Sequence, residues 1–190
     1  MTPTSPPNRA RAAIVAACSA ALFAPLLYPV LTGRVFVYND LSWFHLPLRH
    51  LFQQALQSHD SVLWTPAVFS GLYVHGEGQL GLFHPMHQLL YRLLPLAVAL
   101  NLELIVNYAA GFAGMFVLLR RLRFDHAASL FGAMLFAFSG FNLLHHHHVN
   151  MIAIVAHLPW LLAAADFLIS ADNRRERALG LAAVAAILGS

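Results

Sequence analysis

Four long segments of almost entirely apolar residues constrain this chain more than any other feature. An α-helix rises 1.5 Å per residue, so roughly 20 apolar residues are needed to cross a bilayer. Only 10% of the residues are charged, whereas soluble domains carry about 25%. We therefore expect an all-α fold, a polytopic transmembrane helical bundle. The four predicted spans are residues 12–32, 96–119, 127–144 and 151–170.

Both ends of the chain carry expectations of their own. A fifth apolar segment begins at Ala178 and is too short to span a bilayer by Ser190, so we expect a longer natural chain, of which this is a fragment. The proline-rich residues 1–8 are expected to form a disordered tail. The first span is expected to remain as an anchor, because its apolar run is too long for a typical signal peptide.

The positions of the arginines predict the orientation in the membrane. All 11 basic residues are arginine, and three clusters of them fall on the same side of the bilayer if the spans alternate. The positive-inside rule places that side, with the N-terminus, in the cytoplasm. Residues 1–11 are then a cytoplasmic tail and 12–190 the membrane domain, with a large extracytoplasmic loop at 33–95 and a short outer loop at 145–150. The net charge of +3 is too small to indicate binding to nucleic acid.

The large loop has predicted structure. From Leu41 to Leu56 apolar residues recur with a helical period, and we expect an amphipathic helix on the membrane surface, with Gln53 on its polar side. A second, short helix is expected over residues 86–94, between two prolines. Gly76, Gly78 and Gly81 match G-x-G-x-x-G, but no strand precedes them and no helix follows directly. We therefore expect a flexible loop facing substrate and not a dinucleotide site.

Asp40 is the most informative carboxylate of the loop. It lies just beyond the first span and beside the predicted surface helix. There it could act as a general base on a hydroxyl group, or hold a divalent cation that bridges a phosphate. The simpler reading is an N-cap, worth about 1 kcal/mol to the helix. The residues alone leave these alternatives open.

Histidines and polar groups in the spans allow two readings each. His145–His148 form a run in the short outer loop, where neutral imidazoles could bind zinc or copper. Four consecutive histidines do not have the spacing of a metal site, so we expect a hydrated turn and no metal.

Glu103 lies within the second span and is a candidate for function or for packing. Small residues from Ala110 to Gly114 predict close helix contact.

The order of these motifs resembles the N-terminal portion of the bacterial YfhO-like membrane proteins, which are GT-C-type glycosyltransferases. The resemblance covers about residues 12–170. It is carried by Tyr38-Asn39-Asp40, Leu63-Trp64-Thr65-Pro66, Phe83-His84-Pro85, Leu93-Leu94-Pro95, Ser139-Gly140-Phe141, and the stretch from His148 through Leu158-Pro159-Trp160.

The resemblance implies a multi-pass protein of the bacterial inner membrane that transfers a sugar from a polyprenyl-phosphate carrier to an extracytoplasmic glycan or polymer acceptor. Its partners would be this lipid-linked donor, the acceptor and membrane lipids, with no cofactor. Asp40 matches the catalytic acid of the family's first outer loop. GT-C enzymes often have paired acids where this chain has Asn39-Asp40, so a metal-independent base is the simpler role. Substrate contacts are expected from Asn39, Trp64, Glu77, His84, Glu103 and His148. The alternative is a non-catalytic transport or assembly component.

Overall fold

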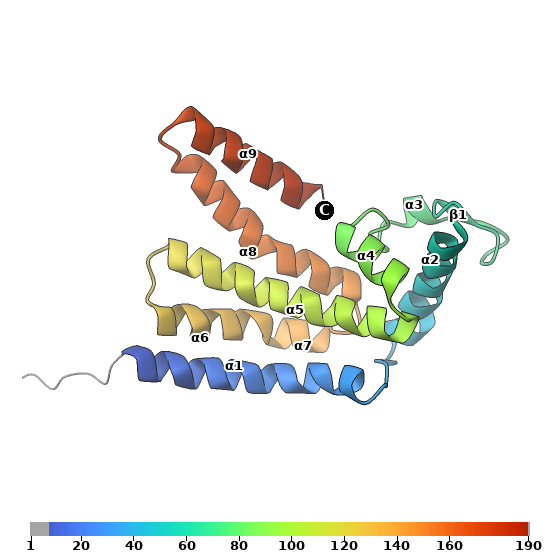
Figure 1. Ribbon diagram of the computed structural model, residues 1–190, viewed down its shortest axis with the longest axis horizontal. Coiled ribbons are helices and arrows are strands. Elements are labelled where there is room, and N and C mark those ends of the chain that lie inside the picture. Colours follow the sequence, from blue (N-terminus) through green and yellow to red (C-terminus); the bar gives the residue numbers. More distant parts are fainter. Residues whose placement is uncertain (1–7, 190) are drawn as a thin grey trace, which may run out of the picture.

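The computed structural model describes residues 8–189 as a bundle of helices with a smaller helical cap at one end (Figure 1). The predicted all-α fold is confirmed, and four segments are long and apolar enough to cross a membrane. Residues 1–7 of the expected N-terminal tail lie outside the described residues. The spans are α1 (Asn8–Leu31), α5 (Leu96–Arg121), α6 (His126–Ala137) with α7 (Gly140–Leu144), and α8 (Val149–Ile169).

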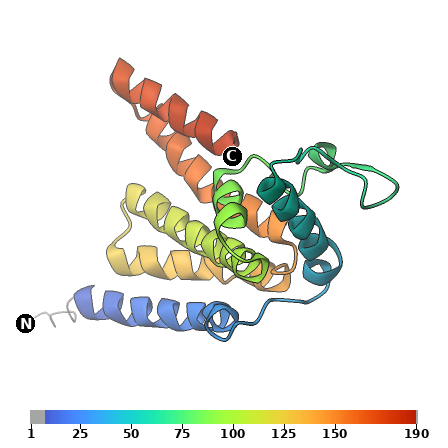
Figure 2. The same cartoon turned by 45° about the vertical axis from the view of Figure 1, so that its right-hand side comes forward.

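Helix α5 lies at the centre of the bundle and packs against α6 and α8, while α1 packs mainly on α6. Small residues bring α5 and α8 close together, as predicted. The Trp160 indole Nε1 donates to the Ala110 carbonyl at 2.9 Å, and a Cβ atom added at Gly114 would lie 2.6 Å from that nitrogen. Helix α9 (Arg174–Leu188) folds back along α8 (Figure 2).

The third span is broken, which the prediction of one continuous helix over 127–144 missed. Helix α6 ends at Ala137, and Ser139 caps α7 by accepting from the Asn142 backbone N–H. The Asn142 side chain donates to the carbonyls of Phe136 and Ala137, at 2.9 and 3.1 Å. A break is tolerated inside a span when other groups satisfy the freed backbone, and the Asn142 amide does so here.

The cap is built from residues between α1 and α5, together with the start of α5. It contains a π-helical turn η1 (Leu41–His45), α2 (Leu46–Ser58), α3 (Val74–Glu77) and α4 (Pro85–Leu93). Two short antiparallel strands, β1 (Trp64–Thr65) and β2 (Leu72–Tyr73), pair Trp64 with Tyr73. Both predicted helices of the loop are therefore present.

The position of the first loop helix differs from the prediction. The apolar side of α2 packs into a protein core and not onto a membrane surface, because Leu48, Phe52 and Leu56 contact loop and α4 side chains that include Leu80 and Tyr91. Gln53, expected on the polar side, is buried. Its amide donates to the carbonyls of Tyr91 and Leu94, at 3.0 and 2.8 Å, and so supplies donors to backbone carbonyls that the end of α4 leaves without partners in the helix.

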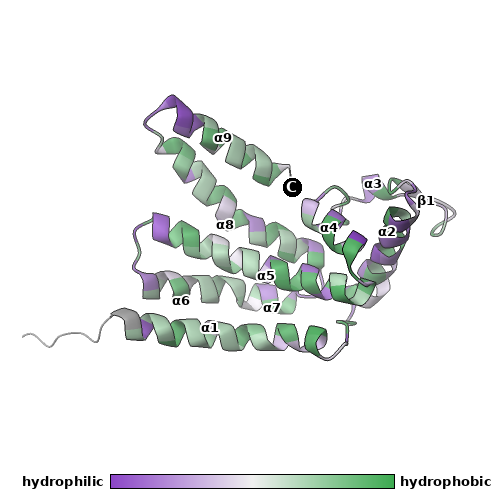
Figure 3. Cartoon of the chain, viewed as in Figure 1, coloured by the Kyte–Doolittle hydropathy of each residue, from purple (hydrophilic) through white to green (hydrophobic). Residues whose placement is uncertain are grey.

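Polarity divides the molecule along its length (Figure 3). The helices of the bundle are mainly apolar, and polar residues gather in the cap and at the opposite turns between α5 and α6 and between α8 and α9. Loop 33–95 and loop 145–150 meet at the cap end, while the arginines at the end of α5 and the start of α9 lie at the other end. The two predicted outer loops therefore lie on the same side of the bundle.

Candidate functional site

Asp40 occupies the N-cap position of η1, but its side chain does not cap the helix. Its backbone is already α-helical and its carboxylate makes no capping hydrogen bond. Its Oδ2 atom instead lies 3.0 Å from Nε2 of His148, the residue that directly precedes α8. The Asp40 side chain is 42% exposed and that of His148 is 31% exposed. The carboxylate is thus held in place by a neighbour and still open to solvent.

Aromatic rings fix the histidine turn beside Asp40. His147 and His148 lie with ring centroids 4.0 Å apart, and Tyr38 contacts the rings of His146 and His147 at 6.0 and 5.6 Å. Burial, followed by the neighbouring His148, lowers the pKa of His147. The histidine turn is therefore packed against the segment that carries Asp40.

A buried ion pair joins the cap to the bundle. Arg49 on α2 and Glu103 on α5 are each 1% exposed, with Nη2 of the arginine 2.5 Å from Oε1 of the carboxylate. The Tyr91 hydroxyl donates to the other oxygen, Oε2, at 2.5 Å. Arg49 also donates to the Leu80 carbonyl. Burial, reinforced by the Glu103 carboxylate, raises the pKa of Tyr91 well above its usual value, so the hydroxyl stays a donor.

The histidines of the cap are fixed individually around this pair. His87 Nδ1 donates to the Gly81 carbonyl at 2.9 Å, and its Nε2 lies 3.2 Å from Glu103 Oε1 without the alignment of a hydrogen bond. His84 caps α4, with Nδ1 accepting from the Met86 N–H. Burial lowers the pKa of His84 to about 4. His45 is 2% exposed, and burial, reinforced by Arg49, lowers its pKa to about 4 as well.

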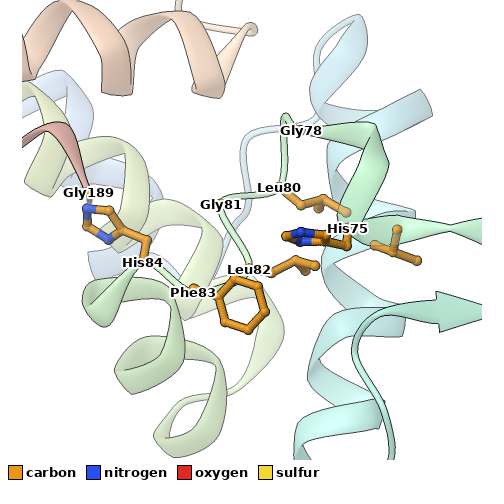
Figure 4. Close-up of a pocket in the computed structure, with 9 residues that line it drawn as sticks. His75, Gly78, Leu80, Gly81, Leu82, Phe83, His84 and Gly189 are labelled. Carbon is orange, nitrogen blue, oxygen red and sulfur yellow. The ribbon is translucent and has the colours of Figure 1, made fainter.

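A cavity of about 440 Å³ opens beside the ion pair. It lies between the loop at 78–84, α8 and the end of α9, and its lining includes Arg49, His84 and Glu103. A smaller cavity of about 240 Å³ lies on the other side of the same loop (Figure 4). The predicted substrate-facing loop thus borders two cavities. It is tied down by hydrogen bonds from Arg49, His87 and Gln88, the last of which donates to the Leu82 carbonyl at 2.6 Å.

The structure brings only some of the predicted site residues together. Asp40 meets His148, and His84 and Glu103 share the larger cavity. The other three do not join them. Asn39 has a positive φ of 48° and accepts hydrogen bonds from Ser42, Trp64 packs on Gly71 in the hairpin, and Glu77 accepts from the backbone of Gln79.

Sequence reasoning missed Arg49 as the partner of Glu103, together with Tyr91 and His45. A signal for Arg49 was present: a carboxylate in a span requires a cation, and the predicted outer side has only Arg34, Arg49 and Arg92. For His45 no signal existed, because its burial comes from contacts between distant segments.

Comparisons with known proteins identify no relative from which a role could be transferred. A scan against models of protein families, a search of curated proteins and a search of solved structures each found no match to this chain. The functional interpretation therefore depends on the geometry of the Asp40–His148 pair, the buried Arg49–Glu103 pair and the cavity that Arg49 and Glu103 line.

Proposed function

We propose that this chain contributes the catalytic loop of a GT-C-like membrane glycosyltransferase, which transfers a sugar from a polyprenyl-phosphate carrier to a glycan or polymer outside the cytoplasm. The observation that carries the proposal is the state of the Asp40 carboxylate. It is exposed, it serves no helix cap, and His148 holds it at the cap end of the bundle. A carboxylate with those properties is available as a general base.

The chemistry assigned to Asp40 is deprotonation of the acceptor hydroxyl. As the acceptor oxygen attacks the anomeric carbon of the donor sugar, a new C–O bond forms and the bond from that carbon to the carrier phosphate breaks. The hydroxyl proton passes to Asp40, and the carrier leaves as the lipid phosphate. An N–H on Nε2 of His148 directed at Oδ2, 3.0 Å away, would leave Oδ1 as the oxygen that takes the proton.

We also propose that the cap faces the outside of a bacterial inner membrane, with the N-terminus in the cytoplasm. The meeting of both predicted outer loops at one end supports this, since they must lie on the same side. Arg120, Arg121 and the arginines from Arg174 to Arg177 then face the cytoplasm.

The test is sugar transfer in membranes that contain the protein, with radiolabelled polyprenyl-phosphate sugars, comparing wild type with Asp40→Asn. Loss of a general base costs about 10²- to 10⁴-fold in rate. Asp60→Asn is the matched control, because within the described residues this exposed carboxylate accepts only from the backbone of Ser61 next to it. We expect Asp60→Asn to transfer at the wild-type rate.

Two outcomes would count against the proposal. Transfer by Asp40→Asn within a few-fold of wild type would remove Asp40 from catalysis. Absence of transfer by the folded wild-type protein with every donor tested would favour the alternative, a non-catalytic transport or assembly component.

A further inference from the structure

The cavity beside α8 changes in character along its length. Helix α8 lines it from Asn150 to Leu161, a stretch of about 16 Å at the helical rise of 1.5 Å per residue. The end near the cap is polar, with side chains from the loop, α2, α4, α5 and α8. The rest is apolar apart from His157, with Ile154 and Leu158 on α8 and Leu188 on α9. A ligand with a polar head and an apolar tail would match both parts.

The polar end holds a buried donor that lacks a partner within the part of the chain that the structure describes. Arg49 and His87 both line the cavity and are 1% and 5% exposed. The Nε atom of Arg49 is buried without a hydrogen bond. The His87 ring is already engaged, because its Nδ1 donates to the Gly81 carbonyl and its Nε2 lies 3.2 Å from Glu103 Oε1. An unpaired buried donor costs about 1–3 kcal/mol, so a ligand that brings an acceptor would recover that free energy.

His84 adds a second donor at this end. Its Nδ1 accepts from the Met86 N–H, so the neutral ring carries its proton on Nε2. The ring points toward Gly189 at the end of α9 and away from His75 and Phe83 (Figure 4). Since Arg49 is already balanced by Glu103, the end of the cavity offers two donors without a large excess of charge. This suits an acceptor-rich head group, such as a phosphate ester.

The apolar wall indicates the direction of entry. Ile154 and Leu158 are 70% and 48% exposed, although both lie in a helix that is long and apolar enough to span a membrane. In a bilayer, exposed side chains of such a helix face lipid. The cavity is therefore open toward the acyl chains, which gives an apolar tail a path from the membrane.

We propose that this cavity is a binding site for a phosphate-bearing lipid, which enters from the bilayer with its head at His84 and Arg49 and its tail along Ile154 and Leu158. The site is independent of sugar transfer and would hold in a protein that catalyses no reaction. If the proposed function is correct, the same site takes the phosphate and chain of the carrier.

Binding is tested on the whole purified chain in detergent, by calorimetry with farnesyl phosphate, farnesol and inorganic phosphate as probes. We expect farnesyl phosphate to bind at one site, farnesol at least about tenfold more weakly, and inorganic phosphate not measurably, because only the first offers both head and tail. This comparison needs no variant. Equal affinity for farnesol and farnesyl phosphate, or no binding of farnesyl phosphate, would overturn the proposal. Tight binding of inorganic phosphate alone would also do so, since it would indicate a simple anion site.

Variants locate the site. His84→Phe removes the donor and keeps a ring, and should weaken farnesyl phosphate binding about tenfold, with partial recovery in His84→Gln. Leu158→Trp fills the apolar part and should weaken binding of the tail. His50→Phe on the exposed side of α2 and Leu135→Trp on α6 are the matched controls and should bind as wild type. Unchanged binding in both His84→Phe and Leu158→Trp would place the lipid elsewhere. Because no sugar is present, these results are independent of the Asp40 assay.

Discussion

Replacing Glu103 by glutamine should destabilise the protein strongly, although the two side chains have nearly the same shape. In wild type the carboxylate accepts from Arg49 and from Tyr91, each at 2.5 Å, and is 1% exposed. Glutamine keeps one oxygen acceptor. The Tyr91 hydroxyl can rotate to accept from the new amide, but a guanidinium cannot accept a hydrogen bond or lose its charge. Arg49 would therefore remain buried beside a neutral group, at a cost of about 3–5 kcal/mol.

The assay is reversible unfolding in mixed micelles of a mild detergent and dodecyl sulfate, followed by circular dichroism. Glu103→Gln and Arg49→Met should each lower the free energy of unfolding by about 3–5 kcal/mol. The double variant removes both charges, so it should be less destabilised than the sum of the single variants by about 2–3 kcal/mol. Arg92→Met is the control. Among residues 8–189 this exposed arginine on α4 donates hydrogen bonds only to Gln88, and its loss should cost less than about 0.5 kcal/mol.

A free energy of unfolding for Glu103→Gln within about 1 kcal/mol of the wild-type value would contradict this prediction, because the carboxylate would then not be compensating a buried charge. A double variant whose loss of stability equals the sum of the two single losses would also contradict it, because independent sites show no coupling.

Three further predictions test other parts of the molecule. In a Cys18→Ser background, a cysteine at Ser61 should react with a membrane-impermeant reagent in intact cells and one at Asp172 should not; the reverse pattern would invert the topology. Gly114→Ala should lower the free energy of unfolding by about 1–3 kcal/mol, because its methyl group would overlap the indole on α8, and a neutral result would mean that α5 and α8 pack less closely. Burial holds the pKa of His45 at about 4, so the unfolded chain binds more protons between pH 6.5 and 4 and stability falls as the pH is lowered through that range. His45→Phe should reduce this slope in acid unfolding curves, and an unchanged slope would exclude His45 as its source.

The positions of the helices could be predicted from the sequence because the length, apolarity and period of a segment are local properties. Spans α1, α5 and α8 begin and end within a few residues of the predicted bounds. Both loop helices also form where they were expected, the first from its apolar period and the second from its place between two prolines. The break at Ser139 was missed because an unbroken apolar run was taken as one helix: the side chain of Asn142 turns back to the carbonyls of Phe136 and Ala137 and so compensates the break locally. A Ser-Gly pair followed by an asparagine inside an apolar run is the pattern that would have indicated it.

The surroundings of the predicted site residues could not be predicted in the same way, because they depend on which distant segments of the chain contact each other. Asp40 could be selected by its place in the loop, yet only the fold distinguishes a cap from a carboxylate held by His148, more than 100 residues later in the chain. Glu103 could be recognised as needing a partner, but three loop arginines were available. The choice falls on Arg49 because α2 turns its supposedly polar side inward, where Gln53 and Arg49 bond to α4, α5 and the glycine loop. A helix that appears amphipathic in sequence can thus bury part of its polar side, when a second layer of protein covers it and supplies acceptors for most of the N–H groups that it buries.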